Sequence, residues 1–333
     1  MKEFIKERCD RMVKDKKMIH KATFFEFDIM EVVASLVLSG AGKDVDIERF
    51  KNCRKILKRN VGFCSCIRGI GETLTVCKMA LAEDPEQYVK DLKTVFDKAM
   101  KKRLINGEYM VLAAANVCDN GRAADVDVLV KKFKEIEDRM EKEHPILTGS
   151  EDWSLSMLLA MTEKSVDTII NEMEEAYDYM RAMKFNSTRN GLQNLTQVLV
   201  LMGGDMKSKC DKVISFVEKL KEKGARYGKD FEVAALGTLI DIDENEDALV
   251  TEIIETADYL KACKGFGSWH IDKKTRLMLA AMIVAESYEK NHLTSVFTPR
   301  IETGAITSTT AVTIATTIMM MMIVCCCYMA SSN

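Results

Sequence analysis

The sequence predicts an all-α protein of about seven tandem helical hairpins, which form either a closed α/α toroid or an open superhelix. The chain has 333 residues but only 3 prolines, so long helices can run without interruption. Stretches rich in Met and Leu favour helix, and the β-branched or aromatic runs that favour strands are rare before residue 305. The third observation is an internal repeat.

The repeat is clearest at the ends of the predicted amphipathic helices, where one apolar anchor recurs. Successive anchors are separated by 43 residues and then by 40 residues four times. They are Leu57, Met100, Met140, Met180, Leu220 and Leu260. Periods of 20–50 residues are typical of solenoids and other helical arrays.

Each repeat unit is predicted to contain two helices of different character. The first is apolar nearly all round, as in SMLLAM from Ser156, and is therefore expected to be buried. The second carries a narrower apolar stripe, as at Val130, Phe133 and Ile136, with Lys and Glu on the opposite face. We therefore expect the first helix of a unit on the inside and the second on the outside.

The repeat runs through every candidate linker, so residues 1–304 are predicted to form a single helical-repeat domain. The segment 305–330 differs, because it carries no charge. We expect it to be an apolar helix buried at the centre or the end of the array, since its threonines are poor helix formers and lower its hydropathy. The alternative is a membrane anchor, because 26 residues are enough to span a bilayer.

Composition excludes some classes of function and indicates a compartment. The net charge is −3, and lysines alternate with acidic residues, so no nucleic-acid surface is predicted. The 11 cysteines are an odd number, and the N-terminus lacks the apolar segment of a secretion signal. Both features predict a cytoplasmic protein with free thiols, with membrane association through residues 305–330 as the alternative.

Metal and cofactor motifs are incomplete, and neither a metal nor a cofactor is predicted. The segment DIDENEDALVTE, from Asp241 to Glu252, has the acidic spacing of a calcium loop, but Glu246 stands where the sharp turn needs glycine. We interpret it as a solvated turn with helix-capping acids. Cys64 and Cys66 lack the second pair that zinc sites use.

The connections from each second helix to the next first helix should lie at one end of the array, where a pocket is predicted. The candidate ligand-binding residues are Arg68, Trp153, Asn190, Gln193 and Trp269, and the candidate acid–base residues are Asp152, Asp230 and His270. The alternative is structural: Asp152, Asn190 and Asp230 cap helices, and both tryptophans pack over helix ends.

Three segments, FCSCIRG, KFNSTRNGLQNLTQVLVL and GFGSWHIDKKTRLMLAA, resemble a bacterial family catalogued as domain of unknown function 4003. The matching positions are Arg68, Asn190, Leu192, Gln193, Leu195, Trp269, Lys274, Arg276 and Ala280. The resemblance covers nearly the whole chain and implies a fold and a cytoplasmic bacterial setting, but no reaction. The Met and Cys runs near the C-terminus depart from the Ala- and Gln-rich sequence expected of the family.

Function remains open among three hypotheses. The leading one is a non-enzymatic binding or scaffold module that holds an unidentified protein or small molecule at one end or along a concave face. The second is a toroid enzyme of lyase or glycosidase type, in which Asp152, Asp230 and His270 face each other across a pocket. The third is a cytoplasmic scaffold tethered to a membrane through residues 305–330.

Overall fold

The computed structural model describes residues 1–23, 26–100, 107–295 and 310–331. Within these ranges it contains fifteen α-helices, four short 3₁₀ turns and no strand. The prediction of an all-α chain is therefore confirmed.

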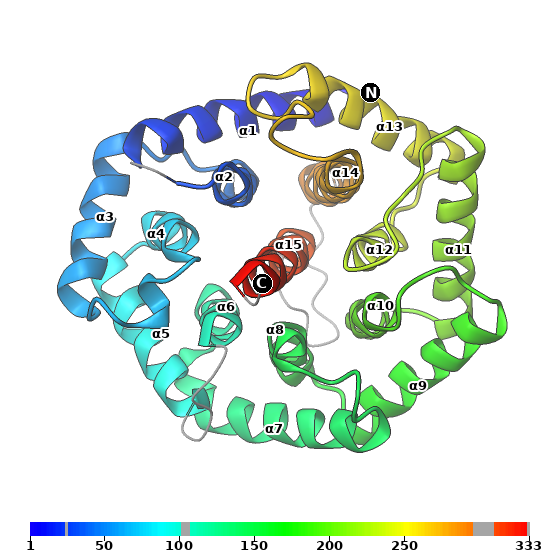
Figure 1. The fold of residues 1–333 in the computed structure, drawn as a ribbon, viewed down its shortest axis with the longest axis horizontal. Coiled ribbons are helices and arrows are strands. Elements are labelled where there is room, and N and C mark those ends of the chain that lie inside the picture. The colour runs from blue at the N-terminus through cyan, green and yellow to red at the C-terminus, as the bar shows by residue number, and fades with distance from the viewer. Residues whose placement is uncertain (24–25, 101–106, 296–309, 332–333) are drawn as a thin grey trace.

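Seven helices form an outer layer that surrounds the rest of the molecule (Figure 1). They are the odd-numbered helices α1 (Glu3–Ala22), α3 (Ile47–Asn60), α5 (Pro85–Met100), α7 (Val126–Glu143), α9 (Val166–Ala182), α11 (Met206–Glu222) and α13 (Glu246–Ala262). Each presents one apolar face inward. In α7, for example, Phe133, Ile136 and Met140 are buried, whereas Lys131 and Glu135 are exposed.

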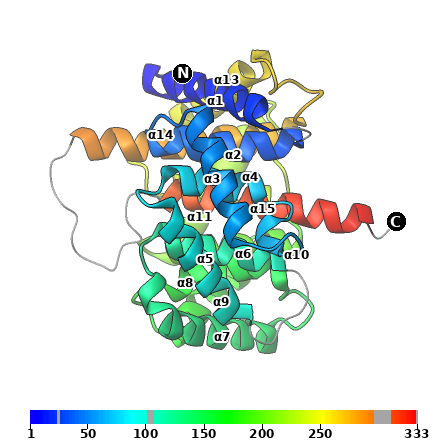
Figure 2. The same ribbon diagram turned by 90° about the vertical axis from the view of Figure 1, so that its left-hand side faces the viewer.

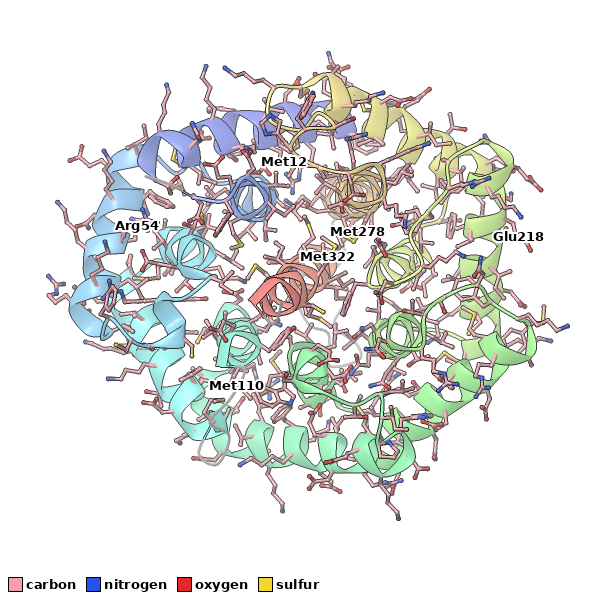
Figure 3. The ribbon with its side chains drawn as sticks, viewed as in Figure 1. Met12, Arg54, Met110, Glu218, Met278 and Met322 are labelled. Carbon is pink, nitrogen blue, oxygen red and sulfur yellow. The ribbon has the colours of Figure 1, made fainter. Side chains whose placement is uncertain are left out.

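The even-numbered helices form an inner layer, and each follows an outer helix in the chain (Figure 1). They are α2 (Asp28–Ala41), α4 (Glu72–Leu81), α6 (Gly107–Asp119), α8 (Trp153–Ala160), α10 (Arg189–Leu201), α12 (Glu232–Leu236, continued by the 3₁₀ turn Gly237–Leu239) and α14 (Lys273–Ser295). These helices are enclosed on nearly all sides, and every residue of α8 is buried. In Figure 3, Met110 and Met278 lie in the interior, whereas Glu218 lies on the outside of α11.

The last helix, α15 (Thr310–Ser331), passes through the middle of the inner layer (Figures 1 and 2). It contacts α2, α6, α8, α12 and α14. Ile314, Ile318, Met319 and Met321 are fully buried, and burial of such a side chain stabilises the fold by about 1.5–3 kcal/mol. Asn116 of α6 donates a hydrogen bond from Nδ2 to Oγ1 of Thr317 over 3.1 Å.

Residues 305–309 and the side chains of residues 310–312 and 326–330, which also belong to the predicted C-terminal segment, lie outside the described part of the structure. Among the helices that the structure describes, none combines the length and the apolar character needed to cross a membrane.

The two ends of the layered arrangement meet where α1 packs against α13 and α14. Buried charges join the elements there. Arg8 of α1 donates hydrogen bonds to Oε2 of Glu286 in α14, at 3.0 Å from Nε, and to the backbone oxygen of Leu36 in α2, at 2.8 Å. Lys16 of α1 lies 2.9 Å from Oε2 of Glu31 in α2. The pair of Arg8 and Glu286 thus joins helices 278 residues apart in sequence, whereas Lys16 and Glu31 join the consecutive helices α1 and α2.

Candidate functional site

A hollow of about 200 Å³ opens on the surface between the end of α9 and the beginning of α10. Its lining combines two arginines, two hydroxyl side chains, two aromatic rings and a leucine. These residues are Tyr177, Arg181, Phe185, Ser187, Thr188, Arg189 and Leu192. All lie in or beside the connection from an outer helix to the following inner helix.

The local sequence explains the shape of this connection. After α9, Lys184 adopts a left-handed backbone conformation with φ of 53°, which turns the chain back towards α10. Thr188 then caps α10, because its Oγ1 accepts a hydrogen bond from the backbone N–H of Gly191 over 3.0 Å. Gly191 is required because a Cβ there would lie 2.6 Å from the backbone oxygen of Asp230. The start of α10 is thus fixed against the next loop.

The two arginines bring two positive charges to the hollow, and no carboxylate in the described part of the chain forms an ion pair with either of them. Arg189 and Arg181 make neither an ion pair nor a hydrogen bond through their guanidinium groups with any residue that the structure describes. The guanidinium of Arg181 lies over the ring of Tyr177, 5.8 Å from its centroid. Because the N-terminus of α10 also carries a partial positive charge, the hollow is suited to an anion.

Tyr177 forms the inner wall of the hollow. Its side chain is only 5% exposed, and its hydroxyl makes no hydrogen bond within the part of the chain that the structure describes. The ring packs against His144, with the ring centroids 4.8 Å apart. Nε2 of His144 lies 2.9 Å from Oε1 of Glu174, so α7 and α9 together hold the tyrosine in place.

Asp152 and Gln193, two of the residues predicted from the sequence, do meet in the structure. Nε2 of Gln193 donates to Oδ2 of Asp152 over 3.0 Å, and the backbone N–H of Gly149 donates to the same oxygen over 2.9 Å. Burial, followed by the negative charge of Glu137, raises the pKa of Asp152 well above its ordinary value. Trp153 is buried beside this pair. The three residues are enclosed by protein, and none of them lines the hollow between α9 and α10.

Asp230 and Asn190 have different surroundings. Asp230 is exposed, and its Oδ1 accepts a hydrogen bond from the hydroxyl of Thr188 over 2.7 Å. It does not cap α12, whose N-cap residue is Phe231, so the prediction of a capping role is wrong for Asp230. Asn190 lies within the first turn of α10, which Thr188 caps, so the capping role is also wrong for Asn190.

His270 and Trp269 belong to the loop before α14. Nδ1 of His270 lies 2.7 Å from Oδ2 of Asp28 at the start of α2. Partial burial raises the pKa of Asp28, but hydrogen bonds from His270 and Lys16 outweigh this effect and leave the pKa below its ordinary value. Trp269 is 100% exposed, so the prediction that both tryptophans pack over helix ends is wrong for this residue.

The acid–base residues predicted from the sequence do not converge on one hollow. The 3₁₀ turn that carries Asp152 precedes α8, and the loop that carries His270 precedes α14; these elements lie on different sides of α15 (Figure 1). The carboxylate of Asp230 instead accepts a hydrogen bond from Thr188, directly before α10.

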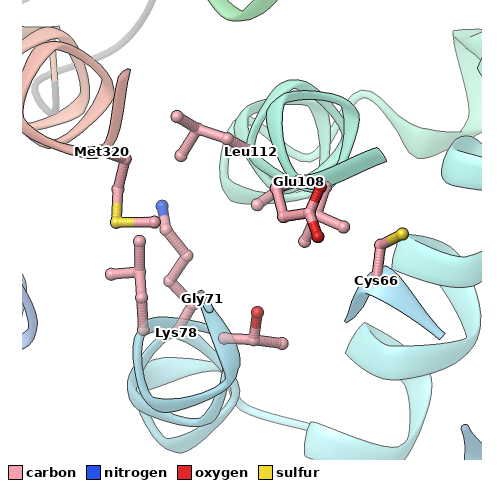
Figure 4. A pocket seen from close by; sticks show the side chains of 10 residues that line it. Cys66, Gly71, Lys78, Glu108, Leu112 and Met320 are labelled. Carbon is pink, nitrogen blue, oxygen red and sulfur yellow. The ribbon is translucent and has the colours of Figure 1, made fainter. Parts of the chain in front are cut away.

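A second hollow lies beside α15 (Figure 4). Cys66, Lys78, Glu108 and Met320 are among the residues that line it. Its volume is about 10 Å³, which is space for about one water molecule. Burial, followed by the charge of Glu108, raises the pKa of the Cys66 thiol, so this cysteine is a poor nucleophile. Arg68, nearby in sequence, donates to Glu72 and to the backbone oxygen of Val61.

The acidic segment before α13 is a helix start. Asn245 caps α13, since its Oδ1 accepts from the backbone N–H of Asp247 over 2.9 Å. Glu252, at the last position of the calcium-like spacing, is buried and accepts a hydrogen bond from Tyr288 over 2.8 Å. Across the described ranges, no three His, Cys, Asp or Glu side chains are grouped in a way that would hold a metal ion.

Sequence reasoning missed Arg181, Ser187 and Arg189, although it quoted the segment KFNSTRNG that contains two of them. The signal available there was Thr188, a preferred N-cap residue directly before a helical arginine.

A family model described as "Protein of unknown function (DUF4003)" matches residues 17–322. No curated protein and no solved structure matches the chain.

Proposed function

The chain belongs to the DUF4003 family of proteins of unknown function, and on that premise we propose that it is a non-enzymatic α/α toroid that binds a small molecule at the hollow between α9 and α10. In this proposal, seven hairpins close around α15 and hold the connection between α9 and α10 rigid. Neither a nucleic acid nor a membrane is proposed as a partner. The cysteines that the structure describes are free thiols, which is in keeping with a cytoplasmic setting.

The observation that carries the proposal is the position of α15. A toroid enzyme of the predicted kind needs an open central pocket, in which two catalytic groups face a substrate. In this chain Ile318, Met319 and Met321 of α15 are fully buried in the middle of the inner layer. The hollow beside Met320 has space for only about one water molecule. A ligand is therefore expected on the outside of the layers.

The enzyme hypothesis gains no support from its nominated residues. Asp152 is 1% exposed and hydrogen-bonded to Gln193, whereas His270 is paired with Asp28 in a different part of the molecule. The hollow between α9 and α10, in contrast, contains polar side chains that have no partner among the described residues. Such convergent polar groups beside apolar walls are the usual mark of a binding site.

The test is a nuclear magnetic resonance screen of the full chain against a set of small soluble fragments, both neutral and charged. Ser187→Trp is the key variant, because it fills the hollow from a surface turn and leaves every buried side chain unchanged. Ser208→Trp, at an exposed position on α11, is the matched control. We expect fragments that bind the wild type and Ser208→Trp but not Ser187→Trp. Fragments that bind all three proteins equally would contradict the proposal.

Turnover is the second measurement on the same proteins. We expect each bound fragment to be recovered unchanged. A substrate that the wild type converts, and that Asp152→Asn or His270→Gln no longer converts, would establish the enzyme hypothesis instead.

A further inference from the structure

We propose that the hollow between α9 and α10 is specific for small molecules that carry a phosphate monoester on a flat apolar group. The inference rests on the proposed function and adds the chemical class of the ligand. It follows from the charge, the donors, the walls and the size of the hollow.

The hollow contains two positively charged side chains. Arg181 and Arg189 both line the hollow, and neither guanidinium has a carboxylate partner in the described structure. A phosphate monoester carries a charge of about −1.5 to −2 at neutral pH, which two guanidinium groups balance. The planar N–H fork of arginine also matches phosphate oxygens with two parallel hydrogen bonds.

Two acidic side chains near the hollow have hydrogen-bond partners other than its arginines. Asp230 accepts a hydrogen bond from Thr188, and Glu174 is paired with His144. Neither carboxylate lines the hollow and neither one pairs with an arginine, but the hydrogen bond from the neutral Thr188 leaves the negative charge of Asp230 in place beside the hollow.

Hydroxyl groups are the other hydrogen-bond donors in the hollow, and two of the three have no partner among the described residues. The hydroxyl of Ser187 makes no hydrogen bond with any described residue, whereas that of Thr188 already serves Gly191 and Asp230. Tyr177 provides an observation that is independent of the helix end. It is more than nine-tenths buried, it lines the hollow, and its hydroxyl has no partner in the described part of the chain. The hydroxyl is not one of the solvent-inaccessible polar atoms without a partner, so it is reached through the hollow and can donate a hydrogen bond to a bound phosphate oxygen.

The walls and the volume define the rest of the ligand. Phe185 and Leu192 supply apolar surface beside the tyrosine ring, which suits a flat group. The volume of about 200 Å³ is below the range of about 300–1,000 Å³ that is usual for drug-sized ligands. The hollow therefore suits a phosphorylated fragment of small size better than a complete dinucleotide.

The test uses phenyl phosphate as the probe and isothermal titration calorimetry on the full chain. Phenol and benzoate are the comparison ligands, since they keep the ring but remove the phosphate. We expect phenyl phosphate to bind at least about tenfold more tightly than phenol, and its affinity to fall with added salt. Benzoate, with a single negative charge, is expected to lie between the two.

Three variants locate the site. Arg181→Gln and Arg189→Gln are each expected to weaken the binding of phenyl phosphate by about tenfold or more, because each removes a charge-assisted hydrogen bond. Tyr177→Phe, which keeps the ring, is expected to weaken it by about threefold to tenfold. Arg226→Gln is the matched control, since Arg226 is exposed and does not line the hollow; it should bind as the wild type does.

Failure of this inference is distinguishable from failure of the proposed function. If phenol binds as tightly as phenyl phosphate, or if Arg226→Gln weakens binding as much as Arg189→Gln, the phosphate specificity is wrong. If phenyl phosphate does not bind, while other fragments bind in a way that Ser187→Trp abolishes, the ligand class is wrong but the binding site stands.

Discussion

The carboxyl group of Asp152 accepts a hydrogen bond from Nε2 of Gln193, 3.0 Å away, in a place where both side chains are at most 3% exposed. The two residues come from the 3₁₀ turn before α8 and from α10, so the bond joins neighbouring units of the inner layer. Its energetic role depends on the proton of Asp152, because burial penalises the charged form of the acid.

Asp152→Asn tests this dependence. The folded-state pKa of Asp152 lies above its ordinary value near 3.8, so its stabilising contribution is full below that pH and is lost as the pH rises towards the folded-state pKa. The variant keeps the shape without the ionisation. We expect its free energy of unfolding in urea, relative to that of the wild type, to increase between pH 4 and pH 7. A difference that does not change with pH would show that Asp152 is not protonated in the folded state.

Arg8→Met tests the buried pair between α1 and α14. The change leaves Glu286, which is 1% exposed, without its main counter-charge. Loss of one partner of a buried pair costs about 3–5 kcal/mol, and we expect the lower end because Lys290 still contacts Glu286. Urea denaturation measures the effect. The control is Lys98→Met, which breaks the exposed pair with Asp127 and should cost about 1 kcal/mol or less; equal costs would refute the prediction.

A double-mutant cycle on Asn116 and Thr317 tests whether α15 is part of the core. Thr317→Val removes the acceptor of a buried amide and is expected to destabilise the fold by about 1–3 kcal/mol. Adding Asn116→Leu should restore part of this loss, which gives a coupling energy of about 1 kcal/mol. Thermal and urea unfolding of the four proteins provide the cycle. Additive effects would mean that the two side chains do not touch in solution.

Tryptophan fluorescence distinguishes the two indole side chains of the chain. Trp269 is fully exposed, whereas Trp153 is buried. We expect acrylamide to quench part of the emission of the wild type, and Trp269→Phe to remove that accessible part. The same substitution should change the free energy of unfolding by no more than about 0.5 kcal/mol. Strong quenching that persists in Trp269→Phe would mean that Trp153 is also accessible.

Periodicity in the sequence predicted the helices well, because the spacing of apolar residues along a helix determines which side chains face the core. The anchors Met180, Leu220 and Leu260 are fully buried, as their positions on amphipathic stripes indicate. The identity of the outer helices followed from the same stripes, since a narrow apolar face needs solvent opposite it. These features require no knowledge of distant contacts.

The candidate site was far less accessible to sequence reasoning, because it depends on how the chain turns and on which distant segments meet. The approach of Arg181 to Arg189 needs the left-handed conformation of Lys184, a residue type that seldom adopts it. The pairing of His270 with Asp28 joins positions 242 residues apart. The apolar composition of α15 alone does not tell a core helix from a membrane segment, since both exclude charge. The contacts of α15 with the inner helices show that it is a core helix.

Helix α15 follows every inner helix in the chain, yet it occupies the space that those helices enclose. The residues that form the apolar walls of that space are therefore synthesised before the segment that fills it. Contacts such as the one between Asn116 and Thr317, 201 residues apart, close a very long loop and can form only once α15 has been synthesised. Such non-local contacts are expected to slow the completion of folding, and the apolar walls stay exposed until α15 packs against them.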